Sequence, residues 1–203
     1  IGKAVHAKII YSNLENENLI TKALIDMYSK CGMIAEAQGL FHTFSSRDLV
    51  TWHILITGYS QLGKDEIVFM LFQQMINHGE EPNLATLAIL LTTCIHTGLL
   101  EEGQLCLDVL RRVYGIIPSL EHLTCMIDLF SRAGCLDKAI MLIKVMPFSP
   151  NLLVWNTMLG ACWKLGDLQL GRLVFEYTLQ FDEDDGATYV CMSNIYAAQS
   201  STI

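Results

Sequence analysis

The side chains of this chain that could carry chemistry are seven cysteines and six histidines, and they are scattered along it. No Cys-x-x-Cys spacing occurs, so half of a typical zinc-ligand pattern is missing. Serine, histidine and aspartate are too common for scattered copies to indicate a hydrolase triad. We therefore expect no metal and no cofactor.

The cysteines also bear on the cellular compartment. Their odd number and the lack of a tight pairing pattern favour a reducing environment. Most of them fall at apolar positions of helical segments, so we interpret them as small buried hydrophobic residues.

The bulk composition limits the partners that the chain can have. The formal net charge of −8 is the opposite of the usual nucleic-acid footprint, so non-specific phosphate binding should be weak, although bases can still be read by hydrogen bonds. Apolar residues make up 52% of 203 residues, which is ample for a core. The most apolar stretch, Leu84–Leu100, contains several threonines and matches a repeat, so we interpret it as a buried helix and not as a membrane span.

Five regularly spaced glycines divide the chain into repeating units. Successive glycines lie 31, 35, 36 and 32 residues apart, at Gly32, Gly63, Gly98, Gly134 and Gly166. Apolar residues recur four, seven and eight positions before each glycine, and five and nine after it, which places them on one helical face. Each unit therefore predicts a helix, a glycine turn and a second helix, and the period predicts a stack of such hairpins. The four prolines fall near unit ends, where a proline can close a second helix.

Several segments resemble pentatricopeptide repeats, and specifically the plant class with mixed repeat lengths, the PLS class. Ala23–Gly32 reads ALIDMYSKCG, similar to the ALIDMYAKCG of a short-type repeat. Gly2–Ala7 reads GKAVHA, similar to the GKQIHA of a long-type repeat. Further matches lie at Asp48–Tyr59, Gly98–Gly103, Glu121–Gly134, Val154–Cys162 and Tyr189–Ala198.

This resemblance implies an all-α fold, a right-handed α-solenoid of helix-turn-helix repeats in one continuous array. The units would be the end of a long repeat at 1–17, a short repeat at 18–48, a standard repeat at 49–83, a long repeat at 84–119, a short repeat at 120–151, a first extension motif (E1) at 152–185 and a truncated second one (E2) at 186–203. The chain begins with Ile1 and shows no targeting segment, so we interpret it as part of a longer protein.

Proteins of this class bind single-stranded organellar RNA and mark cytidines for C-to-U editing, one nucleotide per repeat. The fifth and the last residue of a repeat read the base, and an apolar second residue sandwiches it. The resemblance assigns these reading pairs to Lys22 with Asp48, His53 with Asn83, Ala88 with Ser119, and Thr124 with Asn151, and the sandwich to Leu19 and Val50. Thr with Asn favours adenine in the family, so adenine opposite 120–151 is the sharpest prediction.

Some of these positions depart from the family. Lys22 stands where Asn, Thr or Ser is usual, and it can simply neutralise Asp48; His53 replaces an Asn and can pair without strong choice. Ala88 has no polar group, so its unit should space the RNA without reading it. The pair Asn156 and Asp185 lies in E1 and is assigned no nucleotide. Each polar residue that precedes a helix also suits an N-cap role: Asp48, Asn83 and Asn151.

Three functions follow from these observations. The first is a sequence-selective RNA-binding array in a mitochondrion or chloroplast, with no membrane association. The second is a protein-interaction scaffold, with residues 152–203 contacting proteins of an editing complex. The third is a structural subunit of an organellar ribonucleoprotein. Without the complete zinc motif of a deaminase, the chain itself should not be an enzyme, and editing would need a further C-terminal domain or a partner.

Overall fold

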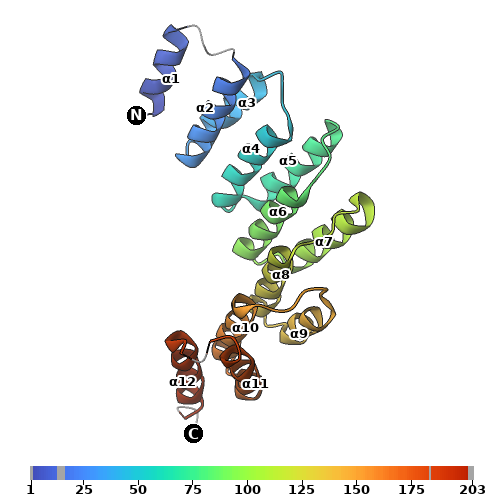
Figure 1. Ribbon diagram of the computed structural model, residues 1–203. Helices are drawn as coiled ribbons and strands as arrows, with labels where there is room; N and C mark the ends of the chain where they lie inside the picture. Colours follow the sequence, from blue (N-terminus) through green and yellow to red (C-terminus); the bar gives the residue numbers. More distant parts are fainter. Residues whose placement is uncertain (1, 13–16, 183, 201–203) are drawn as a thin grey trace. The chain divides into compact units, whose positions relative to one another are not determined.

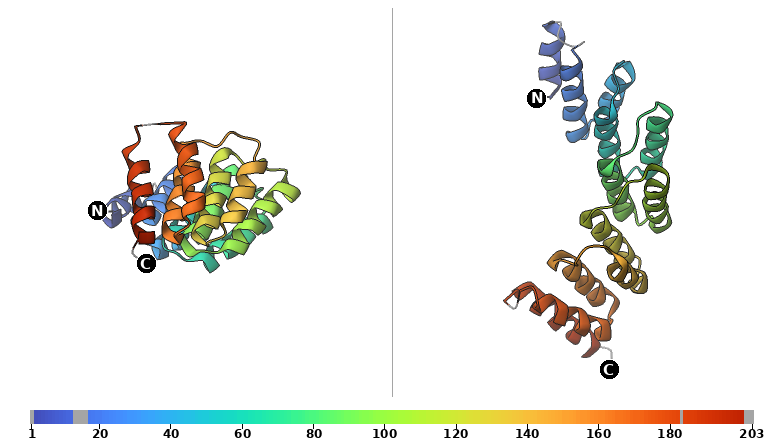
Figure 2. Two further views of the ribbon diagram at one scale, coloured as in Figure 1. Left: turned by 90° about the horizontal axis from the view of Figure 1, so that it is seen from below. Right: turned by 45° about the vertical axis from the view of Figure 1, so that its right-hand side comes forward.

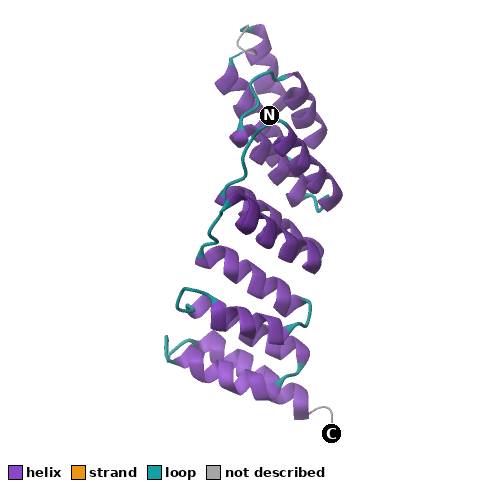
Figure 3. Ribbon diagram, turned by 90° about the vertical axis from the view of Figure 1, so that its right-hand side faces the viewer, coloured by secondary structure: helices purple, strands orange, loops and turns teal. Residues whose placement is uncertain are grey.

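A computed structural model describes residues 2–12, 17–182 and 184–200 of the chain, and the elements in these residues are helices (Figure 3). They are α1 (Gly2–Tyr11), α2 (Asn18–Lys30), α3 (Ile34–Thr43), α4 (Leu49–Gln61), α5 (Asp65–Asn77), α6 (Leu84–Thr97), α7 (Leu100–Tyr114), α8 (Leu120–Arg132), α9 (Leu136–Val145), α10 (Leu152–Leu165), α11 (Leu168–Leu179) and α12 (Gly186–Ser200). The all-α prediction is confirmed.

The predicted glycine turns join the helices of each hairpin. All five repeat glycines have positive φ angles, between 64° and 75°. Gly166, for example, ends α10 in the left-handed conformation and its backbone N–H caps that helix, a geometry that residues with a Cβ rarely adopt. The prolines lie in the connections between hairpins, where they interrupt no helix: Pro82, Pro118, Pro147 and Pro150.

The helices form two compact units (Figures 1 and 2). The first comprises residues 1–97 and 105–117; in it α2, α4 and α6 pack in a row, and α3 and α5 pack against that row. The second comprises residues 98–104 and 118–203; in it α8, α10 and α12 form the row, and α9 and α11 pack against it. We call the helices of the two rows the first helices. Both units therefore have the stacking of an α-solenoid.

In the hairpins α2–α3, α4–α5, α8–α9 and α10–α11 the two helices pack together, and predicted apolar positions supply the core. In the hairpin of α4 and α5, Leu55, Ile56 and Val68 are at most 1% exposed. The position nine residues after the glycine differs, because only Phe41 is buried there, whereas its equivalents are half-buried: Phe72, Leu107, Ile143 and Phe175. Second helices are covered on fewer sides, so their far positions keep contact with solvent.

The apolar stretch at 84–97 is a buried first helix, as predicted. Leu87, Leu90 and Leu91 of α6 are at most 1% exposed. The helix is 14 residues long, which is shorter than a membrane span. Throughout the described ranges, the helices are too short or too polar to cross a bilayer.

Candidate functional site

The residue before a first helix caps that helix in every case except α2, where Glu17 makes no side-chain cap bond. Asp48 and Asn151 are N-caps with extended backbones, and their side-chain oxygens satisfy backbone N–H groups that the helix leaves unpaired. Three such bonds have a length of 3.1 Å: Thr51 N donates to Asp48 Oδ1, Thr86 N to Asn83 Oδ1, and Val154 N to Asn151 Oδ1. The N-cap interpretation is confirmed, and the predicted last residue of each repeat is therefore held at a helix start.

Ser119 caps α8 together with His122. The Ser119 backbone N–H donates to His122 Nδ1 at 3.3 Å, and the Ser119 hydroxyl lies 2.6 Å from the same nitrogen. His122 is 6% exposed, so its ring is part of a buried capping box. The sequence assigned His122 no role; a His three residues after a Ser was the signal that could have found it.

Lys22, the fifth residue of α2, reaches the cap residue of α4. Its Nζ donates to Asp48 Oδ2 at 2.6 Å, and the Thr51 hydroxyl donates to Asp48 Oδ1 at 2.6 Å. Burial raises the pKa of Asp48, but the hydrogen bonds from Lys22 and Thr51 outweigh it and lower that pKa to about 2. Both predicted readers of this unit thus bind each other.

His53, the fifth residue of α4, meets the cap residue of α6 through a threonine. His53 Nε2 lies 2.7 Å from Thr86 Oγ1, which in turn lies 3.3 Å from Asn83 Oδ1 and accepts from Asn83 N at 3.1 Å. Burial lowers the pKa of His53, so the imidazole is neutral near pH 7. Thr86 is 1% exposed and sits between the two predicted readers.

The same arrangement recurs in the second unit. The hydroxyl of Thr188, the third residue of α12, donates to Asp185 Oδ2 at 2.7 Å and lies 3.4 Å from Asn156 Oδ1. The hydrogen bond from Thr188, followed by one from the backbone of Ala187, lowers the pKa of Asp185. Asn156 and Asp185 hold the fifth and last positions of the predicted E1 motif.

The pair Thr124 and Asn151 lacks this bridge. Val154, fully buried, occupies the third position of α10 and offers no hydroxyl. Thr124 Oγ1 instead donates to Leu120 O at 2.8 Å, within its own helix. Thr124 is 9% exposed and Asn151 is exposed. Asn151 is therefore open to a ligand, whereas Thr124 is nearly buried and keeps one lone pair of Oγ1 without a partner among the described residues. Ala88, half-buried, adds no polar atom at its position.

Shallow hollows lie between successive first helices of each unit. One of about 200 Å³ lies between α2 and α4, and His53 and Val50 line it. Its counterpart between α8 and α10 has the same volume and is lined by Asn156. The first hollow contains the ion pair of Lys30 with Asp26.

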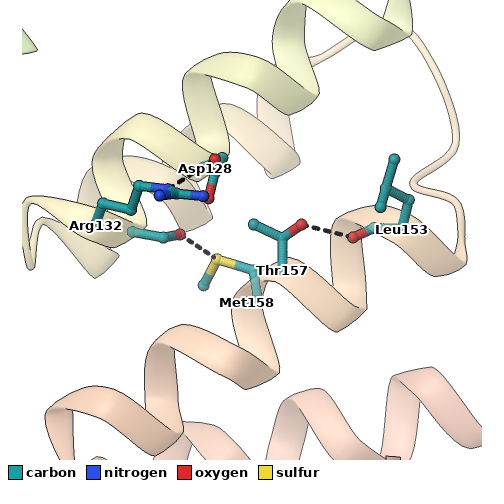
Figure 4. Close-up of polar contacts among 6 residues, drawn as sticks. Asp128, Arg132, Leu153, Thr157 and Met158 are labelled. Carbon is teal, nitrogen blue, oxygen red and sulfur yellow. Dashed lines mark hydrogen bonds and ion pairs between the residues drawn. The ribbon is translucent and has the colours of Figure 1, made fainter. Parts of the chain in front are cut away.

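The hollow between α8 and α10 contains the equivalent ion pair (Figure 4). Arg132 Nε donates to Asp128 Oδ2 at 2.9 Å, one helical turn apart. Across from it, the hydroxyl of Thr157 donates to the carbonyl oxygen of Leu153 at 2.8 Å. Both hollows therefore combine an ion pair with polar groups from a neighbouring helix, and Lys164 adds a second cation to the hollow between α8 and α10.

Large apolar side chains stand exposed at the second position of three first helices, α2, α4 and α10, whereas α8 has Glu121 there. Leu19 is 79% and Val50 is 58% exposed, which leaves both able to contact a flat ring. Leu153, at the same position of α10, is 60% exposed. Sequence reasoning named Leu19 and Val50 but not Leu153, although the repeat register would have found it.

The described residues hold no group of three His, Cys, Asp or Glu side chains that could bind a metal ion. The sequence contains one His-x-Glu spacing, His78 to Glu80, without the Cys-x-x-Cys that completes the zinc motif of a deaminase. It ends α5, where the His78 ring lies 5.4 Å from that of Trp52. All seven cysteines are free thiols, of which only Cys94 and Cys162 are buried, so the expectation that most are buried was too strong.

Sequence comparison matches the chain to pentatricopeptide repeats, both by family models and by similar proteins. The model described as "PPR repeat family" matches residues 47–96, and that described as "PPR repeat" matches 22–49, 121–149 and 153–178. A chloroplastic pentatricopeptide repeat-containing protein of Arabidopsis thaliana is 39% identical over 97% of this chain and 26% of its own length. A mitochondrial one is 36% identical over 99% and 26%. The chain spans about a quarter of the length of these relatives.

Solved structures share the fold. The pentatricopeptide repeat protein PPR10 in complex with an 18-nt psaJ RNA element matches 98% of this chain and 30% of its own, with a TM-score of 0.73 and 18% identity. The PPR domain of Arabidopsis thaliana protein-only RNase P 1 in complex with tRNA matches 90% of this chain and 99% of its own, with a TM-score of 0.71 and 19% identity.

Proposed function

The chain belongs to the pentatricopeptide repeat family, and on that premise we propose that it binds single-stranded RNA along its rows of first helices. The observation that carries the proposal is the convergence of equivalent polar side chains at successive helix starts. The fifth residue of one first helix and the cap residue of the next meet at three junctions, at Lys22 and Asp48, His53 and Asn83, and Asn156 and Asp185. Lys22 and Asp48 meet directly, and the other two pairs meet through a threonine, so each junction presents polar groups at equivalent positions.

Thr124 and Asn151 are the pair best suited to choose a base. The Thr124 proton goes to Leu120 O, which leaves Oγ1 as an acceptor, and the Asn151 oxygen is used in capping, which leaves Nδ2 as a donor. An acceptor beside a donor complements the amino group and N1 of adenine. Cytosine presents the same order of groups and is the nearest competitor. Leu153 supplies an exposed apolar surface next to this pair.

The groups that bind the backbone are few, which agrees with the net charge of −8. Lys30 and Arg132 line the hollows and each is partly neutralised by an aspartate, and Lys164 lines the hollow between α8 and α10 as well. Binding by this part of the protein should therefore be weak and should depend on base contacts more than on charge.

The finer role that we propose is site recognition for C-to-U editing in a chloroplast or mitochondrion. The chloroplastic and mitochondrial relatives support the organelle, and the similarity to extension motifs at 152–203 supports editing. The chain would supply recognition without catalysis, and a deaminase would come from elsewhere in the full protein or from a partner.

The test is selection from a randomised single-stranded RNA pool by the purified chain. We expect the retained RNA to be enriched in adenine at one position. We also expect duplex RNA of matched sequence to be retained less than the single strand. Failure to retain single-stranded RNA above the level of an unrelated acidic helical protein would overturn the proposal.

One observation favours the alternative of a protein partner at the end of the second unit. A hollow of about 700 Å³ between α11 and α12 is lined by Arg172, Phe175, Tyr189 and Tyr196, and the last two are 47% and 44% exposed. Large exposed aromatic side chains of this kind are typical of protein interfaces. If the chain binds an editing-complex protein here, Tyr189→Ser should weaken that binding and leave RNA selection unchanged.

A further inference from the structure

In two first helices, α6 and α12, the third residue lies between the fifth residue of the preceding first helix and the cap residue of its own helix. Thr86 touches both His53, 33 residues earlier, and Asn83. In the other unit Thr188 touches both Asn156 and Asp185. Thr51 binds Asp48, whose second carboxylate oxygen holds Lys22. The three threonines are 2% exposed or less, so no solvent competes for their hydroxyls.

Each bridging hydroxyl has one proton and two lone pairs, so it occupies groups that a base would otherwise use. Thr86 engages one ring nitrogen of His53, and only Nδ1 is left for a ligand. It also lies within hydrogen-bond distance of Asn83 Oδ1, which already accepts from the Thr86 backbone. The bridge orients the reading side chains, and it also uses hydrogen-bonding groups that would otherwise be open to a base.

The junction of Thr124 and Asn151 shows the opposite case. The equivalent third residue is Val154, whose side chain is buried and apolar. Among the described residues, Thr124 Oγ1 donates to Leu120 O and Asn151 Oδ1 accepts from Val154 N, so a lone pair of Thr124 Oγ1 and the Asn151 Nδ2 group keep no partner there.

We propose that the third residue of a first helix is a positioning residue that sets the base choice of the reading pair before it. A threonine hydroxyl there ties the pair together and alters or weakens its choice, and an apolar residue leaves the pair free to select. This inference rests on the proposed RNA binding and adds a third position to the two that contact the base.

Two exchanges test the inference in opposite directions. Val154→Thr places a hydroxyl beside Thr124 Oγ1, where it competes with the adenine amino group. We expect adenine enrichment opposite 120–151 to fall about fivefold, the loss of one hydrogen bond. Thr86→Val removes the bridge to His53, and the base distribution opposite 49–83 should shift by a similar factor. Thr86→Ser keeps the hydroxyl and should restore the wild-type distribution.

Thr93→Val is the matched control for the loss of a buried hydroxyl. Thr93 lies in the same helix α6, is fully buried, and its hydroxyl donates to Ser60 of the preceding first helix at 2.8 Å, away from any reading pair. It should cost stability without changing base choice. Circular dichroism confirms that each variant is folded before selection.

The outcomes separate the inference from the proposed function. If the wild-type chain retains no RNA, the proposed function fails and the inference falls with it. If the wild type selects bases while Val154→Thr and Thr86→Val share its choices, the inference alone is wrong. A rise in adenine enrichment in Val154→Thr would also overturn it.

Discussion

Lys22 and Asp48 lie 26 residues apart and form an ion pair, with Lys22 Nζ 2.6 Å from Asp48 Oδ2. The lysine belongs to α2, whereas the aspartate caps α4, so the pair joins two stacked helices. Because each side chain already satisfies the other, this junction has less to offer a base than the junction of Thr124 and Asn151. The ion pair therefore stabilises the packing of α2 against α4. The proposed base recognition is left to the pair of Thr124 and Asn151.

Acid should weaken this junction. The pKa of Asp48 is about 2 in the folded chain and 3.8 without its partners, so its stabilisation is complete above pH 4 and is lost as the pH falls from about 4 to 2. Lys22→Met should raise the pKa of Asp48 and cost about 1 kcal/mol at neutral pH, a value reduced for solvent screening. Thermal unfolding followed by circular dichroism from pH 2 to 7 measures both effects. A Lys22→Met chain as stable as the wild type throughout would contradict the prediction.

Thr124→Ala should relax the choice of adenine opposite 120–151. The substitution removes the acceptor that faces the adenine amino group, and we expect adenine enrichment to fall about fivefold with little change at other positions. RNA selection followed by sequencing measures this. Thr157→Ala is the control, because Thr157 makes the same backbone bond within α10 but is not a reading residue. Equal effects of the two substitutions would count against base reading by Thr124.

Arg132→Gln should lower affinity for every RNA sequence to a similar extent. Arg132 lines the hollow between α8 and α10, and a contact from its guanidinium to a phosphate carries no information about the base. The slope of log affinity against log salt should become less steep by about 0.7. Filter binding across a salt series measures it. Arg112→Gln is the control, since Arg112 makes an equivalent i, i+4 ion pair on the second helix α7. An unchanged salt slope for Arg132→Gln would place the phosphates elsewhere.

Gly58→Ala should destabilise the first unit. A Cβ at Gly58 would lie 2.7 Å from Ile34 Cδ1 and 3.1 Å from Ser29 Cβ, so the Ile34 side chain would have to move and α2 would have to shift by a few tenths of an ångström, at a cost of about 1 kcal/mol. Gly39→Ala is the contrasting case: nothing lies within 4 Å of its added Cβ, and it should stabilise α3 by about 0.5–1 kcal/mol. Denaturant unfolding distinguishes them, and equal midpoints for both variants would refute the close approach at Gly58.

Much of the fold follows from local sequence. Glycine alone readily adopts the positive φ that ends α10 at Gly166, and Asn151 binds the backbone only three residues ahead, so both features are visible without a partner helix. The apolar period likewise places Leu55 and Ile56 on one face. The division into long, short, standard and extension repeats stays a prediction from resemblance.

The hydrogen-bonding capacity of the candidate site was not visible in the sequence. Thr86 reads as an ordinary helical threonine, and its effect on His53 depends on a contact across 33 residues. Val154 resembles an ordinary core residue in the sequence. Because it has no hydroxyl, nothing at this position bridges Thr124 and Asn151.

By itself the sequence determined the hairpins, their turns and their caps, because these depend on backbone conformation and on bonds between residues a few positions apart. Tertiary structure decided which polar atoms are left for a ligand. The fifth residue and the cap residue come from different helices, so only stacking brings Lys22 to Asp48, joins His53 to Asn83 through Thr86, and leaves Thr124 and Asn151 unbridged.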